Sequence, residues 1–453
     1  MMAKDSKTGV VGTTISMIFL LTIGLLYAAF TPNINPFETW MHTRKDDEVF
    51  GVEEPLNSFF KRLVKGVDRI QLETTGLSCH SDVHSEVCVA NRPVIVDKSA
   101  LTVYVPSNEA QVEYKVQPYA RKEDGTAMKA VTPVQILHGN ISTPPACNFS
   151  YDIPAMIFSS GGFTGNLFHE FNEIIIPLFI MSRSFRSQLQ FVITDFKPWW
   201  VSKYERILSS LSSYDVINSV EKEGVRCYPG AVIGLKFHDN LALNSSDIPG
   251  GYSMFDFKQF LRESYMLKMK DVSNQMGKKP VLVLISRRKT RKFLNEDKMV
   301  EMMEELGFQV IAATPNQTSN LDTFSGLVNS CSVMVGAHGA GLTNALFLPA
   351  GAVLVQVVPL GLDWPSANYY GGPASEMGLN YLEYKIKPEE SSLIDDYGPD
   401  HPVITDPMSI SLKGYRASRA VYVDGQNLKV NLVRFRETLV EAMKLVGGST
   451  PSN

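Results

Sequence analysis

The chain has 453 residues, 44% of them hydrophobic and 20% charged, so it is long enough for two or three globular domains. Its formal net charge of -4 argues against a function that depends on broad electrostatic attraction to nucleic acid, although it allows a local basic cluster. Five cysteines fit an oxidising compartment without requiring one.

An apolar run without charged residues lies near the N-terminus, VVGTTISMIFLLTIGLLYAAF, residues 10–30. Its length matches the roughly 20 residues that span a bilayer. A cleavable signal peptide is the alternative, but the run is long and no A-x-A cleavage site follows it. We therefore predict a cytoplasmic tail (1–9), a signal anchor (10–30) and a stem (31–76) that includes a short helix.

Sequons and cysteines bear on the compartment of the remaining chain. The four N-x-S/T sequons all follow the apolar run, at Asn140, Asn148, Asn244 and Asn316. Their position agrees with a body in the secretory lumen, where they would accept glycans. Cys79 and Cys88 are close enough for a local disulfide and Cys147 and Cys227 are candidates for a longer one, but sequence alone does not fix the pairing.

The first predicted lobe, residues 77–275, mixes strands and helices. Alternating apolar residues predict strands within 93–116, and a small-residue loop at 159–165 leads to a predicted amphipathic helix at 166–183. Further strands are expected at 155–158, 189–194 and 232–237, and further helices at 204–211 and 255–269.

The second predicted lobe, residues 276–427, follows the polar link QMGKKP and reads as alternating strands and helices. Its strands are expected at 281–285, 308–312, 333–335 and 352–359, with helices after Asn295 as N-cap and at 321–330. This order predicts an α/β fold with a doubly wound parallel sheet. The last segment, 428–453, holds an amphipathic helix that is a candidate to cross back onto the first lobe.

The most informative motif is VMVGAHGAGLTNALFLP, residues 333–349. It predicts a buried strand, a glycine-rich turn and a helix start, an arrangement that binds anions through exposed N–H groups. Its spacing is neither a P-loop nor a GxGxxG motif, and a tight packing turn is the alternative interpretation. The candidate ligand-binding residues are His338, Gly339, Ala340, Gly341 and Asn344.

Two further clusters are candidates for chemistry. Ser286, Arg287 and Arg288 directly follow the strand at 281–285, where two guanidinium groups can clamp a diphosphate; a solvated basic loop is the alternative. His169 and Glu170 follow the small-residue loop, so we assign them to acid–base catalysis, although a lone histidine is often structural.

Two neighbours complete the second cluster. Gly165 and Asn166 lie just before His169 and are candidates for substrate contact. On a helix, His169 and Glu173 share a face. No group of residues has metal-ligand spacing, so no metal site is predicted, and no GxSxG elbow is present.

Several segments together resemble plant members of glycosyltransferase family 61. They are GGFTGNLFHEFNEIIIPLF (161–179), RCYPGAVIGLKFH (226–238), LISRRKTRKFLNE (284–296), VGAHGAGLTNALFLPAGAVLVQVVP (335–359) and NYYGGPASEMGLNYLEYKI (368–386). The Cys79 and Cys88 pair, followed by a β-rich stretch, agrees with this resemblance. The resemblance extends over about 77–446.

The resemblance implies a GT-B fold, with two Rossmann-like lobes facing across a cleft, in a Golgi type II membrane glycoprotein. It implies an inverting transferase that moves arabinofuranose or xylose from a UDP-sugar onto xylan, a plant cell-wall glycan. His169 would be the base, and Arg287, Arg288 and the turn with His338 would hold the diphosphate. No permanently bound cofactor or nucleic-acid partner is expected, and the sequence leaves metal dependence and oligomeric state open.

Two alternatives remain from the sequence. One is an enzyme like the N-glycan beta-1,2-xylosyltransferases, which differs only in its acceptor. The other is a non-catalytic glycan-binding member of the family. The donor sugar, the linkage and the acceptor length are not encoded in these motifs.

Overall fold

The computed structural model describes residues 55–219, 224–275 and 277–447. The predicted tail, signal anchor and most of the predicted stem, residue 276 at the predicted lobe boundary and the last six residues lie outside this part. From Leu56 onward the described residues belong to one compact unit. No helix within the described part is both long and apolar enough to cross a membrane.

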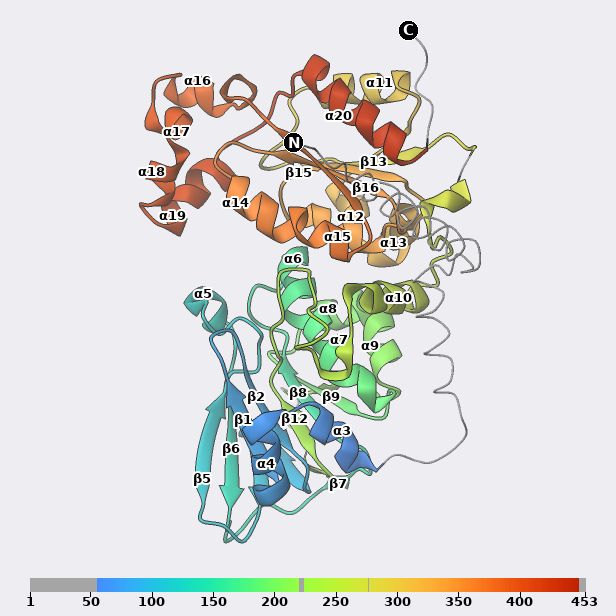
Figure 1. Ribbon diagram of the computed structural model, residues 1–453. Coiled ribbons are helices and arrows are strands. Elements are labelled where there is room, and N and C mark those ends of the chain that lie inside the picture. Colours follow the sequence, from blue (N-terminus) through green and yellow to red (C-terminus); the bar gives the residue numbers. More distant parts are fainter. Residues whose placement is uncertain (1–54, 220–223, 276, 448–453) are drawn as a thin grey trace, which may run out of the picture. The chain divides into compact units, whose positions relative to one another are not determined.

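Two six-stranded sheets form the N-terminal half of this unit (Figure 1). The first contains, in spatial order, β1 (Leu77–Ser81), β2 (Glu86–Ala90), β12 (Ala231–Ile233), β8 (Ala155–Ser159), β9 (Gln190–Thr194) and β10 (Ile217–Asn218). The second contains β5 (Val112–Val116), β6 (Val134–Gly139), β4 (Thr102–Pro106), β3 (Val94–Asp97), β11 (Val225–Tyr228) and β7 (Phe149–Ser150). Strands β12, β8, β9 and β10 run parallel, so their carboxyl ends share one edge.

Alternation along the strands explains how the first sheet packs on both sides. In β8, Ile157 points into the core between the two sheets, whereas Met156 and Phe158 belong to the core under the helices. The α-helices that follow β5 in this half are α5 (Gly125–Met128), α6 (Leu167–Glu170), α7 (Ile176–Ser182), α8 (Pro198–Lys203), α9 (Glu205–Leu211) and α10 (Met254–Ser264). The first sheet is therefore buried on both faces.

Residues 56–76, which we predicted as part of the stem, instead belong to the folded body. They form α3 (Leu56–Arg62) and α4 (Gly66–Thr75), and the apolar side chains of Phe60 and Leu72 lie in the main core. The sequence does not reveal this burial, because the helices are short and α4 also exposes the apolar side chains of Val67 and Ile70, so no clear buried face marks it.

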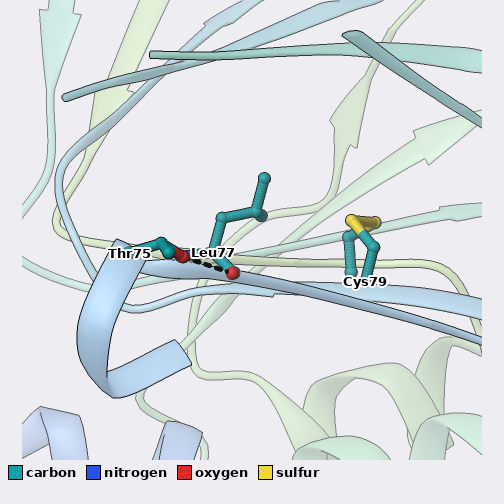
Figure 2. Close-up of a disulfide and its surroundings, with 4 residues drawn as sticks. Thr75, Leu77 and Cys79 are labelled. Carbon is teal, nitrogen blue, oxygen red and sulfur yellow. Dashed lines mark hydrogen bonds between the residues drawn. A yellow bond between two sulfur atoms is a disulfide. The ribbon is translucent and has the colours of Figure 1, made fainter. Parts of the chain in front are cut away.

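Figure 2 shows the junction between α4 and β1. The Thr75 hydroxyl donates to the Leu77 carbonyl over 2.8 Å, and a disulfide joins Cys79 to Cys88. These cysteines are paired residues on adjacent antiparallel strands. A second disulfide joins Cys147 to Cys227 on β11, and Cys331 is buried and free.

A five-stranded parallel sheet forms the C-terminal half. Its order is β14 (Gln309–Ala313), β13 (Val281–Ile285), β15 (Val333–Ala337), β16 (Val353–Val358) and β17 (Asn380–Lys385). Every neighbouring pair is parallel. The predicted doubly wound parallel sheet is confirmed, and the described chain as a whole is a mixed α/β fold with several sheets.

Both faces of this sheet are covered (Figure 1). Leu282 and Leu284 pack with α11 (Glu296–Glu305) and α20 (Leu432–Leu445), whereas Val283 and Ile285 face the side of α13 (Leu321–Asn329). The remaining helices of this half are α12 (Pro315–Ser319), α14 (Asp363–Ser366), α15 (Pro373–Glu376), α16 (Leu393–Tyr397), α17 (Pro402–Thr405), α18 (Pro407–Ser411) and α19 (Tyr415–Ser418). The expectation that the last helix crosses back onto the first lobe is wrong, because its apolar face packs on β16, β17 and α11.

The two halves share one continuous core. Phe347 of the C-terminal half packs against Phe171 and Tyr265, with ring centroids 6.0 and 5.3 Å apart. Arg206 Nε also donates to Asp322 Oδ1 over 2.7 Å. The N-terminal helix α6 consequently lies against the 3-10 helix Ala340–Phe347 that follows β15.

Three local predictions differ from the structure. The predicted helix at 166–183 is α6, a π-helical turn (Phe171–Ile175) and α7, which tertiary packing imposes on an otherwise helical pattern. The segment after the glycine turn is 3-10 rather than α-helical. Asn295 stands before α11, but its side chain bonds the backbone of Val430 in place of a cap.

Candidate active site

The parallel sheet contains a topological switch point between β13 and β15. The chain passes from β13 outward to β14 on one side, and then returns to place β15, β16 and β17 on the other. Loops that leave two adjacent strands in opposite directions open a crevice at the carboxyl edge, where ligands bind in such sheets. The loops at this point contain Ser286–Arg291 after β13 and His338–Gly341 after β15.

Two guanidinium groups lie over the backbone of the glycine turn. A Cβ atom built on Gly339 would lie 2.8 Å from Arg287 Nη1 and 2.9 Å from Arg291 Nη1. Arg291 Nη1 donates to the His338 carbonyl over 2.8 Å, and Arg287 Nε donates to the Thr290 carbonyl over 2.8 Å. Gly339 has φ of 140°, so a side chain here would be both strained and in contact with the two cations.

The arginine pair has no carboxylate in direct contact within the described part of the chain: Asp424 opposes the charge of Arg291 but forms its ion pair with Arg419. Among the described residues, no carboxylate forms an ion pair with Arg287 or Arg291, and the Nε of Arg291 is buried without a partner. Burial, with added repulsion from Arg287, lowers the pKa of Arg291 to about 10, and burial also lowers the pKa of Arg287. Two adjacent cations without a carboxylate partner, Arg291 buried and Arg287 half-buried, form a site for an anionic ligand.

His338 adds a neutral hydrogen-bond donor beside the arginines. Its Nδ1 lies 2.9 Å from Gln356 Nε2, and the Gln356 Oε1 accepts a bond from the Tyr381 hydroxyl at 3.2 Å. An amide NH₂ can only donate, so Nδ1 accepts and the proton of His338 is on Nε2. Burial, followed by the charges of Arg291 and Arg287, lowers the pKa of His338 to about 3, so the ring is neutral at physiological pH.

The other predicted residues of the glycine turn have packing or backbone roles. A Cβ on Gly341 would lie 2.8 Å from Cγ2 of Ile285, so this glycine permits close packing on β13. The first backbone hydrogen bond of the turn runs from the Leu342 N–H to the Gly339 carbonyl. The Ala340 N–H precedes this bond, in the position where a helix start has no internal acceptor. Asn344 Nδ2 bonds the Gly341 carbonyl, and its Oδ1 is buried without a partner.

The predicted pairing of Arg287 with Arg288 differs from the structure. Arg288 is exposed and lies 3.4 Å from Glu296, in the first turn of α11, and the Ser286 hydroxyl donates to the same carboxylate. Neighbouring side chains of this loop point to opposite sides, so Arg291 rather than Arg288 lies beside Arg287. No local sequence pattern predicts this arrangement, because Arg291 reaches the turn through a backbone φ of 53°.

A histidine–glutamate pair lies at the start of the helix α6. His169 Nδ1 is 2.5 Å from Glu173 Oε1, and Asn166 caps the helix by accepting from the Phe168 N–H. The Glu173 carboxylate is fully buried and also accepts from Arg121 Nη1 at 2.9 Å and from the Tyr119 hydroxyl. The carboxylate accepts a hydrogen bond from the Nδ1–H group of His169. The Nε2 atom of this ring therefore keeps a lone pair that can take a proton.

Glu170, which we assigned a catalytic role, faces away from His169. Its buried carboxylate accepts from Lys203 Nζ at 2.5 Å, the Tyr204 hydroxyl at 2.7 Å and the N–H of Gly165 at 3.0 Å. These three bonds tie the small-residue loop to α6 and to α8. The geometry gives Glu170 a positioning role, and Glu173 is the carboxylate beside the imidazole.

Tyr369 connects the two clusters. Its ring lies 4.8 Å from the ring of Phe168, next to His169, and 6.3 Å from the ring of His338 with a 28° angle between the planes. Phe163 packs on the other side of His169 at 4.6 Å. The structure therefore brings a base-competent imidazole and an anion site to the two sides of one tyrosine.

Comparisons with known proteins identify the family to which the chain belongs. Residues 167–355 match the model of the family described as Glycosyltransferase 61. The alpha-1,3-arabinosyltransferase XAT3 of Oryza sativa subsp. japonica is 39% identical over 387 residues, 84% of this chain and 67% of that protein. The xylan glycosyltransferase MUCI21 of Arabidopsis thaliana is 32% identical over 389 residues, 81% of this chain and 79% of that protein. The chain belongs to glycosyltransferase family 61.

A third relative, the beta-1,2-xylosyltransferase XYXT1 of Oryza sativa subsp. japonica, is 37% identical over 338 residues, 74% of this chain and 72% of that protein. Membership of family 61 makes the chain a glycosyltransferase. The matched segment begins at α6 and contains His169, Arg287, Arg291 and His338, whereas Tyr369 lies beyond it.

The sequons of this family 61 member lie on its surface. The four sequon asparagines are exposed, Asn140, Asn148, Asn244 and Asn316. Within the described part of the chain, no group of three or more histidine, cysteine, aspartate or glutamate side chains is placed to hold a metal ion.

Proposed function

We propose that this family 61 enzyme transfers a pentose, arabinofuranose or xylose, from a UDP-sugar onto xylan, with inversion at the anomeric carbon. The observation that carries the proposal is the pair of adjacent guanidinium groups of Arg287 and Arg291, neither in an ion pair with a carboxylate, at the switch point of the parallel sheet. The acceptor is suggested by the relatives, whose names describe a xylan glycosyltransferase and pentosyltransferases.

The donor is proposed to bind through its diphosphate. Arg287 and Arg291 would donate to the phosphate oxygens, and the neutral His338 would add its Nε2–H. When the sugar–oxygen bond breaks, negative charge develops on the leaving UDP, and these fixed donors stabilise it without reorganisation. The buried Oδ1 of Asn344, which has no partner, would accept a hydrogen bond from a hydroxyl of the donor.

The acceptor hydroxyl is proposed to react from the side of α6. His169 Nε2 takes its proton as the oxygen attacks the anomeric carbon, and the bond to UDP breaks in the same displacement. The imidazolium that forms is stabilised by Glu173, which Arg121 and Tyr119 hold in place. A single displacement inverts the anomeric configuration, because the attacking and leaving oxygens lie on opposite faces of the sugar.

The lobe arrangement and the compartment belong to the same proposal. In a GT-B interpretation, the parallel sheet would hold the nucleotide-sugar and the N-terminal sheets would hold the acceptor. The apolar run at 10–30 would anchor the chain in the Golgi membrane, with the body in the lumen, and the exposed sequons and the two disulfides agree with that compartment.

The test is a transfer assay with the full-length protein in detergent. It is incubated with UDP-arabinofuranose or UDP-xylose and with either xylo-oligosaccharides or an N-glycan core, and the new linkage is determined by NMR. Transfer to the xylo-oligosaccharide with an inverted anomeric configuration supports the proposal. Retention of configuration contradicts the mechanism, and transfer only to the N-glycan core contradicts the acceptor.

A non-catalytic glycan-binding protein would bind xylo-oligosaccharides and transfer nothing from any UDP-pentose. If the wild type is an enzyme, His169→Gln should keep UDP binding and lose the transfer that the wild type catalyses. A non-catalytic protein cannot show this loss, because its wild type transfers nothing.

A further inference from the structure

Trp364 is exposed where the fold gives no reason for exposure. It lies on α14, which follows β16 at the same carboxyl edge that carries His338, and 66% of its surface is exposed. Tryptophan is rarely left so exposed, and exposed aromatic residues beside a site often serve as ligand contacts. Its ring centroid lies 5.9 Å from that of Tyr369, with 76° between the planes.

Tyr369 extends this surface toward the reacting groups. It is half-buried between Phe168 and His338. Burial alone would lower the pKa of Arg121, but the Glu173 carboxylate and the nearby Tyr369 hydroxyl raise it, which places this hydroxyl within electrostatic reach of the His169–Glu173 pair. A continuous run of aromatic rings therefore leads from the exposed Trp364 to the candidate base.

A pyranose chain matches this surface chemically. Xylopyranose has no hydroxymethyl group, so both of its faces present C–H groups, while its hydroxyls project from the ring edge. An aromatic ring packs on such a face and leaves the edge hydroxyls in water or in reach of a base. Trp364 carries no charge, so it offers an anionic ligand no ion pair.

We infer that Trp364 and Tyr369, hereafter the aromatic ledge, form an acceptor subsite that binds a xylopyranose ring adjacent to the one whose hydroxyl His169 deprotonates. This inference rests on the proposed function for the identity of the acceptor. The ledge determines how the xylan chain is held, whereas Arg287 and Arg291 lie on the loop after β13, which β15 separates from β16 and the segment that carries Trp364.

The test compares Trp364→Ala, Trp364→Phe and wild type by transfer kinetics with xylo-oligosaccharides of increasing length. Trp364→Ala should raise the KM for oligosaccharides about tenfold and leave the KM for the UDP-sugar unchanged. Trp364→Phe keeps an aromatic face and should recover most of the loss. Tyr214→Ala is the matched control, because this tyrosine is also exposed (37%) but bonds Gln188 just before the amino end of β9, away from the site.

An unchanged oligosaccharide KM in Trp364→Ala overturns the inference, as does a weakened UDP affinity, which would reassign the ring to the nucleobase. Thermal melting of each variant shows whether the fold is intact. If the wild type transfers no pentose, the proposed function fails but the ledge is still tested, by NMR titration of xylohexaose into wild type and Trp364→Ala. Equal binding by both proteins in that titration contradicts the assignment of the aromatic ledge as an acceptor subsite.

Discussion

Replacing Arg291 by methionine should separate ligand binding from stability. The substitution removes the guanidinium and keeps most of the apolar stem of Arg291, a residue that is 8% exposed. A hydrogen bond to a charged group contributes about 1.5–3 kcal/mol, so the affinity for UDP should fall by about 10- to 100-fold. Folding should not suffer in the same way, because this charge is disfavoured in the ligand-free protein.

The stability argument follows from the pKa of Arg291, which burial lowers from its usual range to about 10. A base with a depressed pKa is protonated less favourably in the folded than in the unfolded chain. At neutral pH the penalty is fully present and amounts to about 3 kcal/mol, and it disappears only as the pH rises above 10. Losing the bond to the His338 carbonyl offsets part of the gain, so Arg291→Met should be as stable as the wild type or more stable.

Calorimetry with UDP and thermal melting with and without UDP measure both quantities. Arg288→Met is the matched control, because Arg288 is exposed and lies beside Glu296; its UDP affinity should stay within about twofold of wild type. Equal losses in Arg288→Met and Arg291→Met, or a wild-type affinity in Arg291→Met, would refute the assignment of the anion site.

Four further outcomes follow from the site. Glu173→Gln should lower kcat by about 10²- to 10⁴-fold with UDP affinity retained, because His169 loses the carboxylate that orients it; unchanged kcat would remove the pair from the mechanism. Gln356→Glu should weaken UDP binding about tenfold by calorimetry, because a carboxylate can only accept, so the proton of His338 moves to Nδ1 to donate to it and Nε2 becomes an acceptor. In ligand-free protein, the buried neutral His338 should make stability fall by up to about 1.4 kcal/mol per unit between pH 6.5 and 3, and His338→Gln should flatten this dependence in urea titrations. Glu170→Ala should destabilise the fold by about 3 kcal/mol in the same titrations, because it leaves the half-buried Lys203 and the buried Tyr204 hydroxyl without their acceptor; a fully stable but inactive variant would restore a catalytic role to Glu170.

Much of the architecture was predictable because its signals are local. The run at 281–285 is continuous and apolar, as a strand covered on both faces requires, and the alternating helices impose parallel connections. What failed depends on distant partners. The packing site of α20, the π-helical turn after α6 and the use of the Asn295 side chain by Val430 are decided by tertiary contacts that no local pattern carries.

The residues of the candidate site also divide into those with a local sequence signal and those placed by distant parts of the chain. His169, Arg287 and His338 stand directly after a recognisable loop or strand, so their type and position single them out. Arg291 reaches the site through a left-handed backbone residue, and Tyr369 arrives from a segment beyond the next strand. Of the residues beside His169, the sequence contained a usable signal only for Glu173, the i, i+4 spacing on one helix.

The binding of the diphosphate by paired guanidinium groups is tested most directly by titrating uridine, UMP and UDP into the wild-type protein by calorimetry at one fixed salt concentration. The account predicts that UDP binds at least tenfold more tightly than UMP and that uridine binds more weakly still, because each added phosphate meets unneutralised charge. Uridine binding as tight as that of UDP would contradict it.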